Sequence, residues 1–352
     1  MVYITKFYDS HDNAVAINSL RRIKTIKKLG YQVYIYKHSG KFLYNILSLY
    51  PHIKHSQGII IRIDGSCILD KYSLLKIIFP NKQFIWEVHG FPEENITENS
   101  NYSSRVQVNW KNIKRKIYSF FINLDIFISE ELEIYSKNKI FIHKKIVIQN
   151  YYNAIISNRK STNPLLSLIL NKWKFLVLWG GSAQYPWHAL DVIEQVAKKI
   201  YAKDPKIIFI ILGGTESWHR FNWFKNIILV SKMPLSDYLN FVKKSNICLA
   251  LYNIKSMKFY MSPLKLLDYM ALGKPVITTG IGSIKSLIRN GINGMLTDNN
   301  IDNIVEKILL LKNNPKIAKS LGKNAQITIK HNYNEDKAKR LYQIAFRSVG
   351  IN

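Results

Sequence analysis

Short runs of apolar residues alternate along the whole chain with longer amphipathic segments. Ile207–Leu212 and Ile247–Leu251, for example, hold an apolar residue at every position. A strand with one face in water alternates apolar and polar residues, whereas a strand covered on both faces is apolar throughout. The pattern therefore predicts an α/β fold, in which helices cover both faces of parallel sheets.

The predicted elements form two consecutive series, joined by the polar segment Ser157–Pro164. We therefore expect a first domain over residues 1–155, a second over 156–330, and a C-terminal helix over 331–352 that packs back toward the first. Predicted strands cover Val2–Phe7, Gln32–Tyr36, Gly58–Ile63, Gln83–His89, Ile126–Ser129, Lys145–Gln149, Lys174–Trp179, Ile207–Leu212, Ile227–Val230, Ile247–Leu251, Pro275–Thr278 and Gly294–Leu296. Predicted helices cover Asn13–Leu29, Lys71–Phe79, Val106–Asn123, Ala189–Tyr201, Leu235–Lys244, Leu264–Leu272 and Ile301–Asn313.

One segment of the second series, Met261–Ile277, reads MSPLKLLDYMALGKPVI. Ser262 is a favourable N-cap, Pro263 suits the first helical position, and Gly273 suits the residue that ends a helix. We therefore expect a short helix here. Its free backbone N–H groups and the positive end of its dipole would attract a phosphate group.

Two charged side chains of this helix suit a nucleoside diphosphate. Lys265 lies in the first turn, and Asp268 follows on the same face about 4.5 Å further along the axis. Phosphates at Ser262 and Lys265 would place the ribose hydroxyls near Asp268, whose carboxylate accepts hydrogen bonds. An ordinary lysine–aspartate pair on a capped helix explains the same residues, so both interpretations stay open at this point.

The segment Ser262–Ile277 resembles the signature of the family 4 retaining glycosyltransferases, which have the GT-B fold. The resemblance implies two doubly wound, Rossmann-like parallel-sheet domains that face each other across a cleft. The first domain would bind the acceptor and the second the nucleotide sugar. Four further parts of the chain are similar to motifs of that family and occur in the expected order: Phe84–Gly90 with Pro92–Glu94, Val147–Asn150, Gly180–Ser182 with Pro186–Asp191, and Ile211–Gly214.

The resemblance also implies roles for individual residues. His89 and Lys265 are expected to be catalytic, with Lys265 stabilising the departing diphosphate. A histidine that ends a buried strand is also a common structural residue, and Glu93 and Glu94 fit either a general base or a solvated loop. Donor-binding residues are expected at Gly181, Ser182, His188, Gly213, Gly214, Met233, Tyr260, Ser262, Pro263, Leu264 and Asp268.

Four positions depart from the family's pattern. Tyr260 stands where the first acid of a pair is usual, and Asp268 stands where the second is usually glutamate. Ser182 and His188 stand where an arginine and a lysine usually clamp the diphosphate. Lys265 would therefore supply much of the positive charge that binds the diphosphate.

The resemblance implies an enzyme that transfers a hexose, with retention, from a nucleotide-diphosphate donor to a carbohydrate or lipid-linked acceptor. The resemblance suggests a UDP-sugar as donor and cell-surface glycan synthesis as the setting. A nucleotide-sugar epimerase and a non-catalytic partner subunit of the same fold are the alternatives. The sequence has no Asp-x-Asp, no His-x-x-x-His and no clustered His/Cys set, so we expect neither a metal ion nor another cofactor.

The net charge of +28, from 51 Lys and Arg against 23 Asp and Glu, favours an anionic partner. Nucleic acid is the less favoured partner because no recognition motif for it appears. The basic, aromatic-flanked stretches Arg21–Lys28 and Trp110–Phe121 suit anionic lipid headgroups, although solvated helix faces explain them too.

Two distant cysteines, Cys67 and Cys248, and a start without a secretory signal lead us to expect a cytoplasmic protein, peripheral on the inner face of the cell membrane.

Overall fold

The computed structural model describes residues 1–6, 14–38, 42–94, 105–153, 164–172, 174–183, 185–213, 224–254 and 260–352. The chain divides into two compact units. Unit 1 comprises Met1–Asn150, Met257–Ser262 and Glu335–Asn352, and unit 2 comprises Tyr151–Ser256 and Pro263–Asn334. The short return of the chain into unit 1 before Pro263 was not predicted.

Unit 1 contains a six-stranded parallel sheet in the order β2-β1-β3-β4-β5-β6. The order reverses between β1 and β3, which is the switch point of a doubly wound sheet. The strands are β1 (Val2–Thr5), β2 (Tyr34–Lys37), β3 (Gly58–Ile63), β4 (Gln83–Val88), β5 (Leu124–Phe127) and β6 (Lys145–Val147). The helices are α1 (Ala14–Lys28), α2 (Phe42–Lys54), η1 (Asp70–Leu74), α3 (Leu75–Ile78), α5 (Arg105–Ser119), α6 (Glu130–Ser136) and α15 (Glu335–Ser348).

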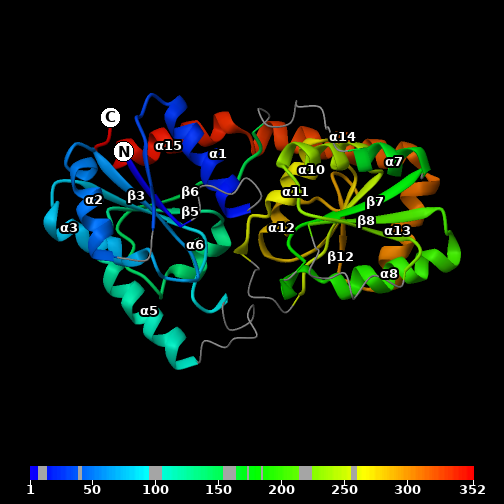
Figure 1. Cartoon of the computed structure of the whole chain (residues 1–352), viewed down its shortest axis with the longest axis horizontal. Coiled ribbons are helices and arrows are strands. Elements are labelled where there is room, and N and C mark those ends of the chain that lie inside the picture. Colours follow the sequence, from blue (N-terminus) through cyan, green and yellow to red (C-terminus); the bar gives the residue numbers. More distant parts are fainter. Residues whose placement is uncertain are drawn as a thin grey trace. The chain divides into compact units, whose positions relative to one another are not determined.

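Unit 2 contains a second six-stranded parallel sheet, in the order β12-β11-β10-β7-β8-β9, with its switch point between β7 and β10. Helices α8 and α13 lie on one face of this sheet and α10 and α11 on the other (Figure 1). The strands are β7 (Phe175–Gly180), β8 (Ile207–Leu212), β9 (Ile227–Val230), β10 (Ile247–Ala250), β11 (Val276–Thr279) and β12 (Met295–Thr297). The helices are α7 (Pro164–Lys172), η3 (Pro186–His188), α8 (Leu190–Lys203), α10 (Leu235–Lys244), α11 (Leu264–Ala271), α12 (Gly282–Leu287), α13 (Ile301–Asn313) and α14 (Pro315–Asn332).

The central strands are buried on both faces, as their continuous apolar sequences predict. Every residue of β8 is buried, and Val177 and Trp179 of β7 pack in one core with Ile193 and Val196 of α8. Because apolar side chains point to both faces of each strand, helices must cover both faces. The structure confirms the predicted α/β class, with two doubly wound parallel sheets.

Several helices of the described ranges were not predicted, among them α2, α6 and α14. Helix α2 contains Pro51, whose missing N–H group weakens a helical pattern. It forms nevertheless because Leu49 and Ile53, on either side of the proline, are fully buried in the core of unit 1. In the C-terminal region, α14 ends at Asn332 and α15 begins at Glu335, so the stretch predicted as one helix contains the junction of two. Within the described ranges, each helix is too short or too polar to cross a bilayer.

Candidate functional site

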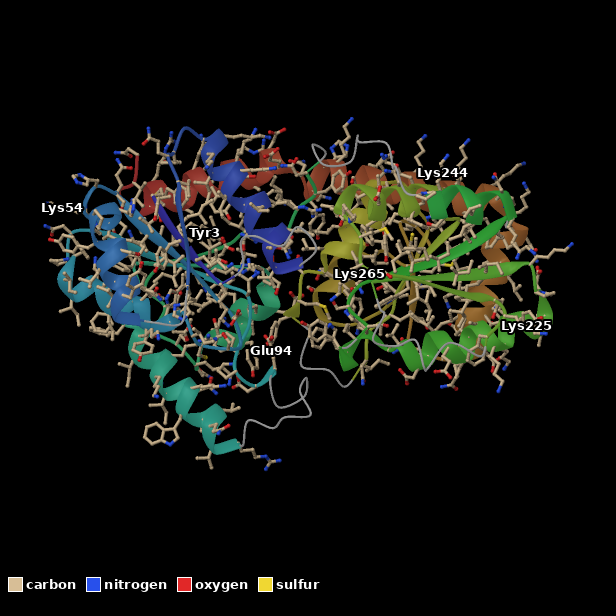
Figure 2. The ribbon with its side chains drawn as sticks, in the orientation of Figure 1. Tyr3, Lys54, Glu94, Lys225, Lys244 and Lys265 are labelled. Carbon is tan, nitrogen blue, oxygen red and sulfur yellow. The ribbon has the colours of Figure 1, made fainter. Side chains whose placement is uncertain are left out.

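Lys265 lies at the switch point of unit 2, in the first turn of α11 (Figure 2). Its Nζ atom is 4.3 Å from the ring centroid of Trp179 and 5.7 Å from that of Tyr252. Trp179 belongs to β7 and Tyr252 follows β10, the two neighbouring strands between which the order reverses. Ligands of open α/β sheets bind beyond the carboxyl ends of the strands at such a point. The ammonium of Lys265 is therefore in the position from which a cation meets an anionic ligand.

The surroundings of Lys265 are aromatic and poor in negative charge. His188 is buried, and its Nδ1 atom lies 3.3 Å from Nζ of Lys265. Among the residues that the structure describes, no carboxylate forms an ion pair with Lys265, and burial lowers its pKa well below the ordinary lysine value. An anion placed beside this ammonium would supply the missing charge and favour the protonated form.

Two glycines at strand ends leave room beside Lys265. A Cβ atom on Gly181, which follows β7, would lie 2.7 Å from Nζ of Lys265 and 3.2 Å from the ring of Trp179. Gly213, which follows β8, has a φ angle of +90°, and a Cβ atom there would lie 2.5 Å from the carbonyl oxygen of Gly181. Gly213 therefore requires glycine, whereas a methyl group at Gly181 would compete for space with the ammonium of Lys265. Gly214, also predicted to bind the donor, is outside the described residues.

Helix α11 begins at Leu264, the first residue of the predicted range, but its N-cap differs from the prediction. Pro263 is the N-cap residue and makes no side-chain capping bond, and the helix begins at Leu264. Ser262 does not cap the helix. Its Oγ atom accepts a hydrogen bond from the backbone N–H of Asn150 at 3.2 Å, and its carbonyl oxygen accepts one from Nδ2 of Asn150 at 2.6 Å. The prediction of Ser262 as N-cap was therefore wrong, because a tertiary hydrogen bond occupies its hydroxyl.

The other predicted donor-binding residues of unit 2 differ in accessibility. Asp268 is 4% exposed and contributes to the electrostatic environment of Tyr238, whose pKa is raised by burial first and by this carboxylate second. Ser182 and Met233 are half-buried, in the segments that follow β7 and β9. The ribose contact of Asp268 and the donor contacts of Ser182 and Met233 remain predictions.

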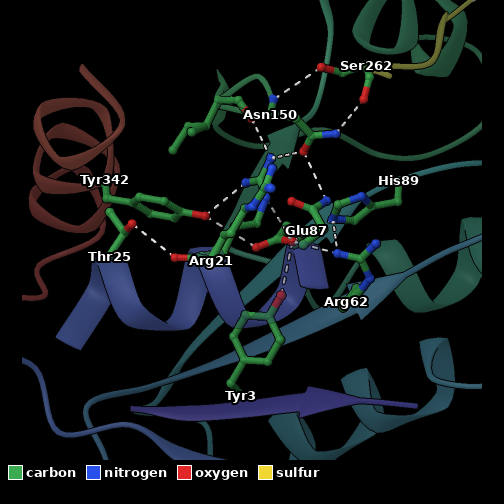
Figure 3. A network of polar contacts seen from close by, with 12 residues as sticks. Tyr3, Arg21, Thr25, Arg62, Glu87, His89, Asn150, Ser262 and Tyr342 are labelled. Atoms are coloured by element: carbon green, nitrogen blue, oxygen red, sulfur yellow. Dashed lines mark hydrogen bonds and ion pairs between the residues drawn. The ribbon is translucent and has the colours of Figure 1, made fainter. Parts of the chain in front are cut away.

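His89, the other expected catalytic residue, directly follows β4 in unit 1 and lies beside the buried Glu87 (Figure 3). Its Nε2 atom is 2.5 Å from Oε1 of Glu87 and 2.8 Å from Nη1 of Arg62. Burial and the nearby Arg62 guanidinium lower the pKa of His89 to about 3. The imidazole is therefore neutral near pH 7. Nε2 thus lies between an acceptor, the Glu87 carboxylate, and a donor, the Arg62 guanidinium.

The same network extends from Glu87 to α1, to α15 and to Asn150, all within unit 1 (Figure 3). The Nε atom of Arg22 on α1 lies 3.5 Å from Oε1 of Glu87. Nη1 of Arg22 donates to the hydroxyl of Tyr342 on α15 at 2.9 Å, and Nη2 donates to Oδ1 of Asn150 at 3.1 Å. Arg21 and Arg22 are 2% and 0% exposed. The prediction that these two cations of Arg21–Lys28 face a membrane was therefore wrong, because both guanidinium groups are buried within unit 1.

Tyr260 belongs to unit 1 and is held there by its hydroxyl and its backbone. The hydroxyl donates to Oε1 of Glu94, and Oγ of Ser129 donates to the carbonyl oxygen of Tyr260 at 2.6 Å. Glu94 is buried and also accepts a hydrogen bond from the backbone N–H of Phe91, so it is not part of a solvated loop. Glu93 instead bonds to Lys139 and Asn112. A contact of the Tyr260 hydroxyl with the nucleotide sugar remains a prediction; while the hydroxyl donates to Glu94, it could only accept a hydrogen bond from the ligand.

Sequence reasoning missed residues that shape both regions. Trp179 and Tyr252 are indistinguishable from core aromatics in the sequence, and only the sheet order brings them to Lys265. Arg22 and Glu87 come from separate elements and meet through long-range packing. A search of the described residues finds no group of three or more His, Cys, Asp or Glu side chains arranged to hold a metal ion.

Comparison with known proteins places a family match on the part of the chain that carries Lys265. Residues 182–328 match the family described as glycosyl transferases group 1. Two uncharacterised glycosyltransferases of Methanocaldococcus jannaschii are similar in sequence, one 30% identical over 177 residues and the other 43% identical over 58 residues. These alignments cover 47% and 16% of this chain, and 43% and 16% of the relatives, so the chain matches less than half the length of either.

Solved glycosyltransferase structures match both units. The sucrose-phosphate synthase of Thermosynechococcus elongatus has a TM-score of 0.72 at 13% identity, over 99% of this chain and 98% of that one. A glycosyltransferase of Rickettsia africae also has a TM-score of 0.72, at 16% identity over 99% and 97% of the chains. HepE of Anabaena in complex with UDP has a TM-score of 0.70 at 12% identity, over 99% of both chains. This likeness shows that the chain has the GT-B fold of these glycosyltransferases.

Proposed function

We propose that the protein is a retaining hexosyltransferase that moves a sugar from a nucleoside-diphosphate donor to the hydroxyl of a glycan or lipid-linked acceptor. The proposed donor is a UDP-sugar, and the proposed setting is cell-surface glycan synthesis. The observation that carries the proposal is Lys265 at the switch point of unit 2. Its half-buried ammonium has no carboxylate partner among the described residues, and Gly181 leaves space next to it. HepE, one protein of similar fold, has been solved with UDP and with UDP-glucose.

In this proposal Lys265 binds the diphosphate and stabilises it as it leaves. The bond between the anomeric carbon and the diphosphate oxygen breaks, and a bond from the acceptor oxygen to the same face of that carbon forms. The acceptor proton passes to the departing phosphate oxygen. Negative charge therefore grows on the diphosphate, where a fixed cation in a poorly hydrated site is most effective. The first N–H groups of α11, from Leu264 onward, add donors and a favourable dipole.

His89 acts, in this proposal, as a hydrogen-bond acceptor for a sugar hydroxyl. We place the proton of the neutral ring on Nε2, in a hydrogen bond that Glu87 accepts, so that Nδ1 presents its lone pair. Because its pKa is about 3, His89 keeps this state throughout the neutral range. It is therefore unsuited to donate a proton near pH 7. We propose in addition that the reaction needs no metal ion or other cofactor, since Lys265 supplies the positive charge.

The test is a thermal-shift screen of the purified protein against nucleotide sugars, followed by product analysis with the donor that binds. A ligand specific for the folded state raises the melting temperature. We expect a nucleoside-diphosphate sugar to stabilise the protein and a labelled donor to transfer its sugar with the anomeric configuration retained. Lys265→Ala should abolish transfer at an unchanged melting temperature. Transfer by Lys265→Ala at a near-normal rate would contradict the proposal.

The same assay separates the alternatives. A labelled donor that returns as its epimer would indicate an epimerase. Binding of the nucleotide sugar without turnover, with any acceptor supplied, would indicate a non-catalytic partner subunit.

A further inference from the structure

Helix α5 in unit 1 exposes a continuous apolar stripe. Its residues recur every three or four positions, as they must to share one face of a helix. Each of the five side chains is between 50% and 63% exposed, although large apolar groups are usually covered. We call this feature the α5 stripe; it consists of Val106, Trp110, Ile113, Ile117 and, directly after the helix, Phe120.

The opposite face of α5 is anchored to unit 1. Val108, Arg115 and Ser119 are buried there. Nε of Arg115 donates to the carboxylate of Asp70 at 2.6 Å, and Nη1 donates to the carbonyl oxygen of Gly90 at 2.7 Å. The helix therefore has a fixed packed side and a fixed exposed side. Because Gly90 follows His89, the same guanidinium ties α5 to the loop that carries the proposed acceptor of a sugar hydroxyl.

The charged side chains of α5 that border the α5 stripe are all positive. The helix has no Asp or Glu, whereas Arg105, Lys114 and Lys116 are exposed and Lys111 is half-buried. Nζ of Lys116 also lies 5.5 Å from the ring of Phe141, a residue that is itself 46% exposed. The exposed surface thus combines apolar side chains, tryptophan and phenylalanine rings, and cations.

We infer that the α5 stripe is a membrane-docking surface that lies in the headgroup region of an anionic bilayer. A helix of 15 residues, about 22 Å long, lies along the interface with its apolar face down. The flanking cations then meet anionic lipid headgroups. This inference goes beyond the proposed transferase activity, and it would bring a lipid-linked acceptor to unit 1.

Charge disfavours the other occupants. A second copy of the chain docked through the same face would bring two sets of cations together without an acidic residue on either α5. Nucleic acid would use the cations but gains little from an aliphatic stripe, since phosphate contacts dominate its binding. An anionic bilayer uses both the apolar and the charged components.

The test is flotation of the full-length protein with vesicles of phosphatidylcholine alone and of phosphatidylcholine mixed equally with phosphatidylglycerol. We expect salt-sensitive binding to the mixed vesicles. The double variant Trp110→Gln/Ile117→Gln should lower the partition coefficient at least about tenfold. The matched control Leu47→Gln/Ile344→Gln changes two side chains of unit 1 that are 75% and 59% exposed on α2 and α15, and it should bind like the wild type.

Charge is tested separately. Lys114→Gln should weaken binding to the mixed vesicles about fivefold, and Lys323→Gln, an exposed lysine on α14 of unit 2, should not. Circular dichroism melting should give the same midpoint for all variants, because the exchanged side chains are exposed. Equal flotation of the Trp110→Gln/Ile117→Gln variant, or a wild type that does not float, would overturn the inference. The inference would also be overturned if the wild type formed a dimer that the Trp110→Gln/Ile117→Gln exchange dissociates while vesicle binding stays unchanged. Vesicle binding does not depend on turnover, so its failure would leave the proposed transferase function untouched.

Discussion

Glu87→Gln provides a test of the buried network around His89. Glu87 is fully buried, with Oε1 3.4 Å from Nη1 of Arg62 and 3.5 Å from Nε of Arg22. The exchange keeps the shape of the side chain but removes the carboxylate charge that faces both guanidinium groups. Removal of one partner from a buried ion pair costs about 3–5 kcal/mol. We therefore expect a loss of this size in the unfolding free energy of unit 1.

The loss translates into a large change in melting temperature. For a unit of this size, each kcal/mol corresponds to about 2–4 °C, so Glu87→Gln should lower the midpoint of unit 1 by roughly 6–20 °C. The assay is differential scanning calorimetry, which separates transitions of the two units if they unfold independently. Glu335→Gln is the control, because its partner Lys28 is 38% exposed and a surface pair contributes less than about 1 kcal/mol.

The contribution of Glu87 to the unfolding free energy should decrease at acidic pH. Burial alone would raise the pKa of Glu87, but Arg22, the hydrogen bond from His89 and Arg62 hold that pKa far below its usual value. A carboxyl group with a lowered folded-state pKa stabilises the protein above the unfolded-state pKa, near 4, and loses that contribution as pH falls below it. The difference in unfolding free energy between wild type and Glu87→Gln should therefore be constant between about pH 6 and 8 and should become smaller as the pH falls below about 4. A midpoint within the error of the control at pH 7 would refute the reasoning.

Three further changes test other parts of the structure. Asp125→Asn should raise the unfolding free energy at pH 8 by about 1–3 kcal/mol but not at pH 4. The buried carboxyl oxygens of Asp125 have no hydrogen-bond partner among the described residues, and burial raises the pKa of this group. The folded state therefore favours the protonated carboxyl, and this contribution to stability is lost as the pH rises. Urea titrations at both pH values measure this, and equal effects would contradict it. Tyr260→Phe should cost about 1.5–3 kcal/mol, the contribution of a hydrogen bond to a charged group, without changing UDP affinity; an altered affinity in calorimetry would instead indicate a donor contact. Gly181→Ala should impair donor binding at an unchanged fold, because its Cβ would lie 2.7 Å from Nζ of Lys265, and normal binding would argue against the site.

The α/β class and the position of Lys265 could be predicted because both depend on local sequence. Continuous apolar runs indicate strands covered on both faces, and the segment around Lys265 has a helix-start pattern close to the observed one. The N-cap of α11 was misassigned because the hydroxyl of Ser262 is taken by Asn150, 112 residues earlier in the chain. Local rules contain no information on such a partner.

The surroundings of the two expected catalytic residues could not be predicted for the same reason. Arg22 is one of several cations on α1 and, by composition, suits a solvated helix face, yet it is fully buried beside Glu87. Trp179 and Tyr252 meet at Lys265 because β7 and β10 are neighbours in the sheet, although they are distant in sequence. Sheet order, rather than residue pattern, decides these contacts.

The central claim is that Lys265 binds the diphosphate of a nucleotide donor, and calorimetric titration with UDP and with uridine tests it most directly. Hydrogen bonds to charged groups contribute about 1.5–3 kcal/mol, which corresponds to about 10- to 150-fold in Kd. We expect wild type to bind UDP at least about tenfold more tightly than uridine. Lys265→Met should lose most of this preference for UDP, and its melting temperature should be unchanged. Equal affinity of wild type for UDP and uridine, or an unchanged preference in Lys265→Met, would contradict the account.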